Sequence, residues 1–349
     1  MKISIGTKIK EGPWGGGNLF AINLKKYLEQ KGHTVVNNLT DNDIDLILIT
    51  EPRKTSESSA FTHVEVLNYL SYVKPDTLVV HRINECDERK NTNYVNKYLI
   101  NANKVADHTV FVSKWLKDLY FEQGLKRNNL EVIYAGADKE IFNRMNFKKW
   151  DGKNPLKIVT HHWGANWNKG FEYYLLIDSY INHKKWKNKI EFTYIGNLPK
   201  SIKFENTKVV EPLSGISLAN EIKKNDLYIT GSVNEPSGNH HIEGSQCGLP
   251  LLYINSGGIP EYCDGFGVMF NNKSDFEEKL IKSIDNYELI SKKVENYPNS
   301  AEIMSKDYLG LFEEMIKNKE KYLSERKITL TKSYFGSKIF NFKRGRSNY

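Results

Sequence analysis

Between Gly231 and Glu243 the sequence reads GSVNEPSGNHHIE, and these residues carry the most information about the fold class. They directly follow the apolar run DLYIT, which has the length and composition of a buried strand. A turn at 236–238 then leads into residues with a helical pattern. The stretch therefore predicts a strand–turn–helix unit of the kind that builds a parallel, helix-covered sheet.

The same turn has the features of an anion site. Pro236, Ser237 and Gly238 open a helix whose first backbone N–H groups are unpaired and lie at the positive end of the helix dipole, which suits a pyrophosphate. Glu235 stands at the strand end, and Glu243 lies eight positions later on the helix, where its carboxylate can accept hydrogen bonds from a ribose diol. A glutamate near a helix start can equally be a capping residue, so the spacing by itself leaves both roles open.

Strand and helix patterns alternate through the first half of the chain. A short apolar run is followed by a glycine-rich stretch and then by an amphipathic run that begins at Asn18 and is ended by Gly32. The predicted strands of this half are residues 2–6, 33–37, 45–50, 77–83, 108–113 and 130–136.

The second half repeats this order after a polar segment at 148–154, which we interpret as the linker. Its predicted strands include residues 155–160, 190–196, 208–212, 226–231 and 250–254, with two helices after Asp275. The pattern predicts an α/β protein of two facing Rossmann-like, doubly wound domains, 1–148 and 149–325, with a cleft between them. In such sheets ligands bind beyond the carboxyl ends of the strands.

The composition is that of a globular protein. Of the 349 residues 39% are hydrophobic and 26% charged, which is enough to fill two cores and cover them. No apolar run approaches the roughly 18 residues of a membrane helix, and no signal region is present, so we expect a cytoplasmic location. Cys86, Cys247 and Cys263 are widely spaced and odd in number, which favours reduced thiols over a disulfide framework or a CxxC metal site.

The formal net charge is +8, and the most biased segment is 326–349. This tail contains seven Lys or Arg and no acidic residue, interleaved with aromatic side chains. It predicts peripheral association with an anionic membrane face or an acidic acceptor, with nucleic acid as the weaker alternative. The equally weighted alternative is that its first part packs on the first domain.

Two further motifs follow the two glutamates: Cys247-Gly-Leu-Pro250 and Gly257-Gly-Ile-Pro-Glu261. Together the four elements resemble the signature of family 4 of the retaining glycosyltransferases, which have the GT-B fold. The resemblance covers most of the chain. Supporting matches are residues 110–118, residues 132–142 and the glycine-rich loop Gly15–Gly17.

The resemblance implies transfer of a sugar from a nucleoside-diphosphate sugar to a hydroxyl of a glycan, glycoprotein or glycolipid. By it, Glu243 holds the donor ribose and Glu235 contacts the transferred sugar. Backbone amides near Gly238 and Asn239 bind the phosphate and the sugar. Lys169 matches the family's diphosphate-binding lysine, and its alternative role is a solvated surface residue.

His81 matches a family histidine that faces the donor sugar, so that His81, Glu235 and Lys169 are the predicted catalytic residues. A histidine at a strand end is, however, often a hydrogen-bonded structural residue. Gly16 and Gly17 are expected to let the backbone of the first domain approach the bound substrates.

Several positions depart from the family pattern. Trp163 stands where an arginine is common, six residues before the lysine, so that His162, Arg82 or the helix N-terminus would have to supply the missing charge. Ser237 replaces a usual phenylalanine. Trp14 either stacks on an acceptor sugar ring or anchors its loop. No Asp-x-Asp motif occurs in the expected strand setting, so we expect no metal and no cofactor beyond the nucleotide-sugar co-substrate.

Three other functions share features with this sequence. A dehydrogenase would use tandem Rossmann units, but Gly15-Gly-Gly-Asn18 lacks the GxGxxG spacing. A nucleotide-sugar epimerase shares the two-domain construction. A degenerate, non-catalytic sugar- or nucleotide-binding module is suggested by Trp163 and by the basic tail.

Overall fold

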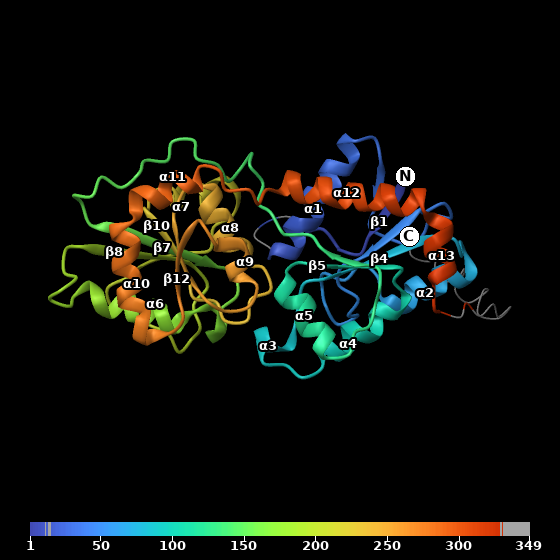
Figure 1. Ribbon diagram of the computed structural model, residues 1–349, viewed down its shortest axis with the longest axis horizontal. Coiled ribbons are helices and arrows are strands. Elements are labelled where there is room, and N and C mark those ends of the chain that lie inside the picture. The colour runs from blue at the N-terminus through green and yellow to red at the C-terminus, as the bar shows by residue number, and fades with distance from the viewer. Residues whose placement is uncertain (11, 13–14, 329, 331–349) are drawn as a thin grey trace.

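The computed structural model describes residues 1–10, 12, 15–328 and 330, which form two lobes side by side (Figure 1). Each lobe contains a six-stranded sheet, with the orders β2-β1-β3-β4-β5-β6 and β12-β11-β10-β7-β8-β9. All ten strand pairings within these sheets are parallel. The predicted α/β class with two doubly wound sheets is confirmed.

The first lobe contains β1 (Lys2–Ile5), α1 (Gly16–Gln30), β2 (Thr34–Val36), β3 (Leu46–Ile49), α2 (His63–Tyr72), β4 (Leu78–Ile83), α3 (Asp87–Lys90), α4 (Val95–Ala102), η1 (Asn103–Val105), β5 (His108–Phe111), α5 (Lys114–Glu122) and β6 (Leu130–Val132). Its central strands are buried on both faces, as expected for a parallel sheet covered by helices. The last strand is shorter than predicted and ends at Val132.

The second lobe contains β7 (Leu156–His162), η2 (Trp167–Lys169), α6 (Phe171–Ile181), β8 (Ile190–Gly196), β9 (Lys208–Val210), α7 (Gly215–Ile222), β10 (Leu227–Thr230), α8 (Asn239–Gln246), β11 (Leu251–Ile254), α9 (Ile259–Cys263), β12 (Gly267–Phe270), α10 (Lys273–Asp285) and α11 (Tyr287–Val294). Strand β12 was not predicted. The last elements in the described part of the chain are α12 (Ala301–Lys317) and α13 (Lys319–Glu325), so that four described helices follow β12 where two were expected.

Helices α12 and α13 return to the first lobe. Helix α12 lies along α1 (Figure 1), and its Tyr308 and Phe312 belong to the same buried cluster as Ile3 and Leu46 of the first sheet. The predicted span of 149–325 for the second domain therefore includes 25 residues, 301–325, that cover the first sheet.

The chain crosses between the lobes twice, and the two crossings are hydrogen-bonded to each other. The backbone N–H of Ala301 donates to the carbonyl of Ala137 at 2.8 Å. At Gly136 an added Cβ would lie 2.1 Å from the carbonyl carbon of Ser300, so only glycine permits this approach. The lobes are thus connected by two adjacent chain segments rather than by a single linker.

Arg326, the first residue of the predicted tail, is anchored on the first lobe. Its Nε and Nη2 donate to Asp107 at 2.7 and 2.6 Å, and Nη2 also donates to the carbonyl of Thr77. Ile328 and Leu330 pack against a hydrophobic cluster of the same lobe. The remaining tail, 331–349, and Trp14 lie outside the described residues, so membrane association and sugar stacking by Trp14 stay predictions.

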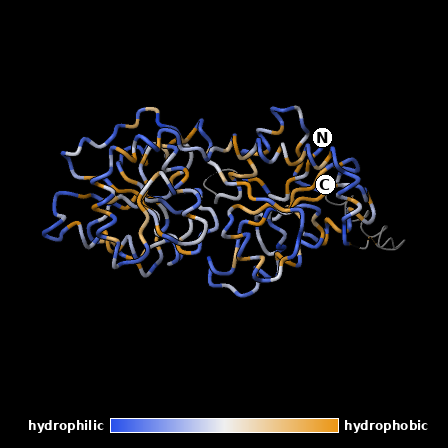
Figure 2. Tube along the Cα trace, viewed as in Figure 1, coloured by the Kyte–Doolittle hydropathy of each residue, from blue (hydrophilic) through white to orange (hydrophobic). Residues whose placement is uncertain are grey.

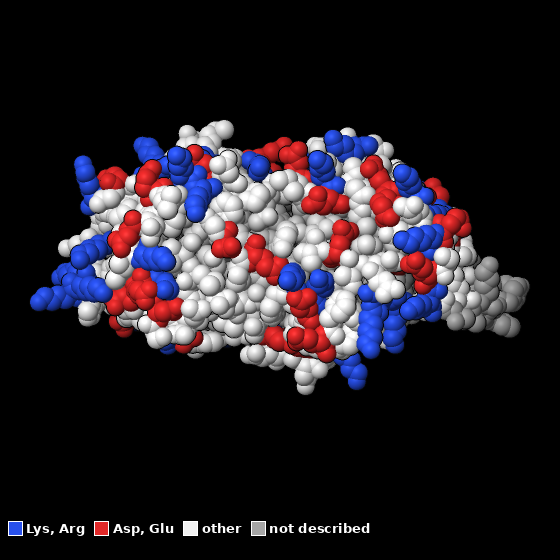
Figure 3. All heavy atoms as spheres, viewed as in Figure 1, with Lys and Arg blue, Asp and Glu red and all other residues white. Residues whose placement is uncertain are grey.

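Apolar segments follow the two sheets, and hydrophilic ones lie mainly along the outer loops and helices (Figure 2). On the face drawn in Figure 3 acidic and basic side chains are interspersed over both lobes. Within the described part of the chain, no helix combines the length and the apolar character that crossing a membrane requires.

Candidate functional site

A cavity of about 360 Å³ lies between the two lobes, a size within the range of small-molecule sites. The first lobe contributes Gly12, Gly15, Gly16, Gly17, Leu19, Arg82, Asn84, Arg89 and Lys90 to its lining. The second lobe contributes His161, His162, Trp163, Gly164, Asn166, Lys169, Ile195, Gly196, Pro212, Leu213, Ser214, Gly215, Leu218, Glu235, Ser237, Gly238, Asn239, His240 and Glu243. Ile141 and Phe142, in the segment that joins the lobes, complete it. Several of these residues follow the carboxyl ends of β4, β7, β8 and β10, where ligands of parallel sheets bind.

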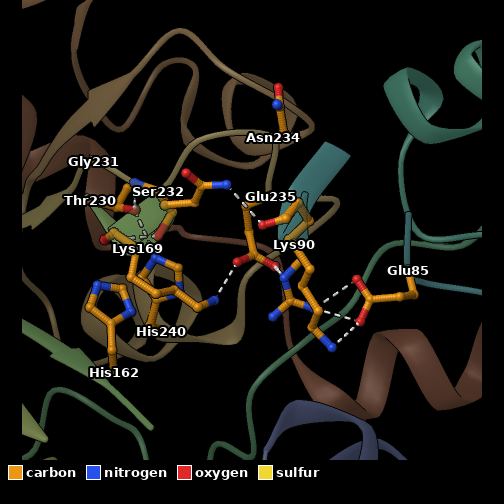
Figure 4. Close-up of polar contacts among 12 residues, drawn as sticks. Glu85, Lys90, His162, Lys169, Thr230, Gly231, Ser232, Asn234, Glu235 and His240 are labelled. Carbon is orange, nitrogen blue, oxygen red and sulfur yellow. Dashed lines mark hydrogen bonds and ion pairs between the residues drawn. The ribbon is translucent and has the colours of Figure 1, made fainter. Parts of the chain in front are cut away.

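Lys169 and Glu235 meet in this cavity as a buried ion pair, with Nζ 2.6 Å from Oε2 (Figure 4). Gly170 makes the approach possible, because its φ is 101° and an added Cβ would lie 2.6 Å from the carbonyl carbon of Gly231. The hydroxyl of Ser232 donates to the carbonyl of Lys169 at 3.3 Å. The loop after β7 is thereby fixed against the end of β10, and the structure brings these two predicted residues together.

Glu235 also pairs across the cavity with the first lobe. Its Oε1 lies 3.1 Å from Nε of Arg89, on the short helix α3. Arg89 in turn has Nη1 3.4 Å from Glu85, and Lys90 has Nζ 2.7 Å from the same carboxylate. A chain of five alternating charges thus runs from one lobe to the other.

These neighbours determine the ionisation of the pair. Burial by itself would raise the pKa of Glu235, but the charges of Arg89 and Lys169 outweigh it and lower that pKa to about 2. Burial and the charge of Arg89 lower the pKa of Lys169, although Glu235 opposes this. Glu235 is therefore a carboxylate at neutral pH and has no proton to donate.

The second glycine turn holds the backbone of Glu235 in place. The N–H of Gly258 donates to the carbonyl of Glu235 at 2.9 Å. At Gly257, where φ is 64°, an added Cβ would lie 2.5 Å from the same carbonyl oxygen. The Gly-Gly-Ile-Pro-Glu motif therefore packs against the backbone of Glu235 and fixes its position. Its Glu261 accepts two hydrogen bonds at 2.7 Å from the first N–H groups of α5, across the lobe interface.

Glu243 lies deeper in the second lobe and has a different kind of partner. Its Oε2 is 2.7 Å from Nε2 of His161, whose Nδ1 is 3.0 Å from the hydroxyl of Tyr228. A neutral imidazole satisfies both contacts if Nε2 carries the proton and Nδ1 accepts from the tyrosine. Of the two Glu243 carboxylate oxygens, Oε1 then keeps its acceptor capacity for a ligand in the cavity.

Two helix N-termini meet at the cavity. Helix α8 begins after Gly238 and α1 after Gly15, and a glycine at the cap position has no side chain to bond the first N–H groups. The two ends are close, because a Cβ added to Gly16 would lie 3.0 Å from the side chain of Asn239. Both present unpaired backbone donors and positive dipole ends, which favour an anion between the lobes. Gly16, Gly17, Gly238 and Asn239 line the cavity at these two ends, and their predicted binding roles stay predictions.

The structure does not place His81 in the cavity. Its Nδ1 lies 3.2 Å from the amide of Asn103 on the opposite face of the sheet, and burial lowers its pKa to about 3. Side chains alternate along a strand, so it is the next residue, Arg82, that lines the cavity. The guanidinium of Arg82 is 4.0 Å from the ring centre of Phe20. A catalytic contact through His81 has no support from this geometry.

Sequence reasoning missed Arg89 and Lys90 and gave His161 no role. Arg89 and Lys90 belong to the polar run DERK, which has the composition of a solvated surface helix. His161 stands two residues before Trp163, and nothing in the sequence around it indicated Glu243 as its partner. No group of three or more His, Cys, Asp or Glu suited to a metal ion occurs in the described part of the chain. Metal independence stays a prediction.

Comparison with known proteins identifies the fold. No known family model matches the chain, and no curated protein sequence matches it either. Among solved structures, a glycosyltransferase from Rickettsia africae ESF-5 is similar with a TM-score of 0.63 at 16% identity, over 91% of this chain and 99% of that one.

Two more solved structures share this arrangement. Anabaena Alr3699/HepE in complex with UDP-glucose has a TM-score of 0.61 at 14% identity, covering 92% of this chain and 99% of its own. Sucrose-phosphate synthase (tll1590) from Thermosynechococcus elongatus has a TM-score of 0.59 at 12% identity, covering 91% and 99%. At such low identity the likeness establishes architecture alone: the chain has the GT-B fold, two Rossmann-like domains facing each other across a cavity.

Proposed function

We propose that this protein is a retaining glycosyltransferase that moves a sugar from a nucleoside-diphosphate sugar to a hydroxyl acceptor. The observation that carries the proposal is the pair of carboxylates in one cavity, beside a buried lysine and two uncapped helix N-termini. The family resemblance assigns the same residues to the donor. The similar HepE structure contains UDP-glucose, which supports this class of donor.

The donor fits the cavity in one direction. The free oxygen of Glu243 accepts from the ribose diol, and the N-terminus of α8 and Lys169 bind the diphosphate. The nucleobase then lies toward Gly196 and the 212–215 loop, which also line the cavity. The transferred sugar lies at Glu235, facing the first domain.

Charge stabilisation is the main catalytic device. As the bond between the sugar and the diphosphate breaks, the leaving group gathers negative charge and the sugar becomes oxocarbenium-like. Lys169 and the α8 N–H groups stabilise the negative charge of the leaving group. The ionised Glu235 stabilises the positive charge on the sugar. The acceptor hydroxyl attacks from the side of the first domain, near Arg82 and Asn84, and its proton passes to an oxygen of the departing diphosphate. Retention of configuration rests on the family resemblance.

The acceptor is a glycan, glycoprotein or glycolipid. The first-domain side of the cavity is lined by Gly15, Gly16, Gly17 and Asn84, where backbone and small polar groups leave room for a sugar hydroxyl. Peripheral attachment to an anionic membrane through 331–349 belongs to the same proposal, because a glycolipid acceptor would lie there.

Release of nucleoside diphosphate from a panel of UDP-, GDP- and ADP-sugars tests the proposal, with glycan and glycolipid acceptors, in EDTA and in magnesium. We expect acceptor-dependent release that EDTA leaves nearly unchanged, because Lys169 and the helix N-termini meet the phosphate charge. Free epimerised donor in the absence of an acceptor would instead identify an epimerase. Binding without any turnover would identify a non-catalytic module, and loss in EDTA that magnesium restores would contradict metal independence.

A further inference from the structure

Among the described residues of the second domain, one Lys or Arg lines the cavity. Lys169 is that cation, and six residues earlier Trp163 is 46% exposed and uncharged. His162 does not replace it, because its Nε2 is 2.7 Å from the hydroxyl of Tyr174 and burial lowers its pKa well below 6.5. A second charge has to come from elsewhere.

Arg89 of the first domain lies in the right place. Its Nε is 3.1 Å from Oε1 of Glu235, while Lys169 is 2.6 Å from Oε2, so the two cations flank one carboxylate. The carbonyl of Arg89 accepts a hydrogen bond from the side chain of Asn168 at 3.2 Å. The side chain of Arg89 is 23% exposed and lines the cavity, so a ligand there can reach it.

The charges leave this cluster ready for an anion. Lys90, Arg89 and Lys169 carry three positive charges against the two negative charges of Glu85 and Glu235. Toward the described residues, the guanidinium of Arg89 makes its polar contacts through Nε and Nη1. A guanidinium has five N–H donors in a rigid fork, and two of them suit a phosphate bidentately.

We propose that Arg89 binds the distal phosphate of the donor from the first domain, as the second cation beside Lys169. This inference rests on the proposed function. The ribose lies at Glu243 and the sugar at Glu235, so a group in contact with Glu235 lies at the sugar end of the diphosphate. The diphosphate then bridges both domains, and the leaving group receives its full positive surroundings only when α3 is against the second domain.

The test compares nucleoside diphosphates with nucleoside monophosphates, because only the former have the distal phosphate. Calorimetry measures the binding of UDP, GDP and ADP and of UMP, GMP and AMP to the wild type, Arg89→Gln and Arg89→Lys. We expect Arg89→Gln to weaken the diphosphate on the order of 10- to 100-fold and to leave the monophosphate nearly unchanged. Arg89→Lys should lie between, since lysine keeps the charge without the fork.

Arg144→Gln is the matched control, because this arginine pairs with Glu295 at 2.9 Å and does not line the cavity. Equal weakening of both ligand classes in Arg89→Gln, or unchanged diphosphate affinity, would overturn the proposal, with thermal unfolding confirming that the variant is folded. If Arg89→Gln does not fold, Arg89→Lys replaces it, and the same ratio of diphosphate to monophosphate affinity is compared with that of the wild type. If Glu243→Ala loses nucleotide binding and Arg89→Gln does not, the Arg89 proposal fails and the proposed function stands. If the wild type binds no nucleotide, both are contradicted.

Discussion

Glu235 and Glu243 stand eight residues apart on one strand–turn–helix unit, yet their surroundings differ in kind. Glu243 contacts His161, from β7 of its own domain, through a 2.7 Å hydrogen bond. Glu235 contacts two cations, Lys169 of its own domain and Arg89 of the other. One carboxylate is thus held inside a single domain, and the other is held by both.

In the proposed reaction, this difference assigns the two carboxylates to different stages. The environment of Glu243 persists when the domains separate, so it can hold the nucleotide in the ground state and the transition state alike. The environment of Glu235 is complete only when the domains meet, which is also when the reacting sugar is enclosed. Interactions made only in the transition state change turnover, whereas uniform binding changes affinity.

The largest expected effect separates the two carboxylates by turnover. Glu235→Gln should lower kcat by roughly 10²-fold or more, because the amide cannot stabilise the positive charge that develops on the sugar. The affinity for nucleoside diphosphate should be unchanged or higher, since Lys169 and Arg89 lose a competing carboxylate. Steady-state rates and calorimetry measure both quantities. Glu278→Gln, an exposed glutamate on α10, is the control, and a wild-type kcat in Glu235→Gln would refute the catalytic role.

A smaller effect is expected on the free energy of unfolding at low pH, and it concerns Glu235. The pKa of Glu235 is about 2 in the folded protein, against an ordinary value of 4.5. Its contribution to stability is therefore present above about pH 4.5 and is lost as the pH falls toward 2, which amounts to a loss on the order of 3 kcal/mol.

Urea unfolding between about pH 5 and pH 2 measures this loss. Glu235→Gln cannot titrate, so its free energy of unfolding should fall less steeply than that of the wild type in the same range. Parallel curves for the two proteins would show that Glu235 does not have the strong ion pairs described here.

Much of the fold could be predicted from sequence, because alternating apolar runs and helical patterns are local. Strand β12 was missed, since its four residues follow a glycine turn closely and alternate too briefly to stand out. The return of α12 to the first sheet could not be predicted either. An amphipathic pattern shows that a helix has a buried face, but it does not show which of two sheets covers that face.

The candidate site likewise contains residues that local sequence patterns predict and residues that they do not. The second-domain residues Lys169, Glu235 and Glu243 were predicted because they belong to continuous motifs, and the structure brings Lys169 and Glu235 into contact. Arg89 was missed because its role depends on how the domains meet, which no local pattern encodes. The cavity faces Arg82 rather than His81 because adjacent residues on a strand point to opposite faces.

The most direct test of the donor site is calorimetric titration of Glu243→Ala with the nucleoside diphosphate that the wild type binds. If Glu243 holds the ribose, the variant should lose about 1.5–3 kcal/mol of binding free energy, the worth of hydrogen bonds to a charged group. Its turnover at saturating donor should fall less than that of Glu235→Gln. Wild-type nucleotide affinity in a correctly folded Glu243→Ala would contradict the donor-site assignment and, with it, the proposed function.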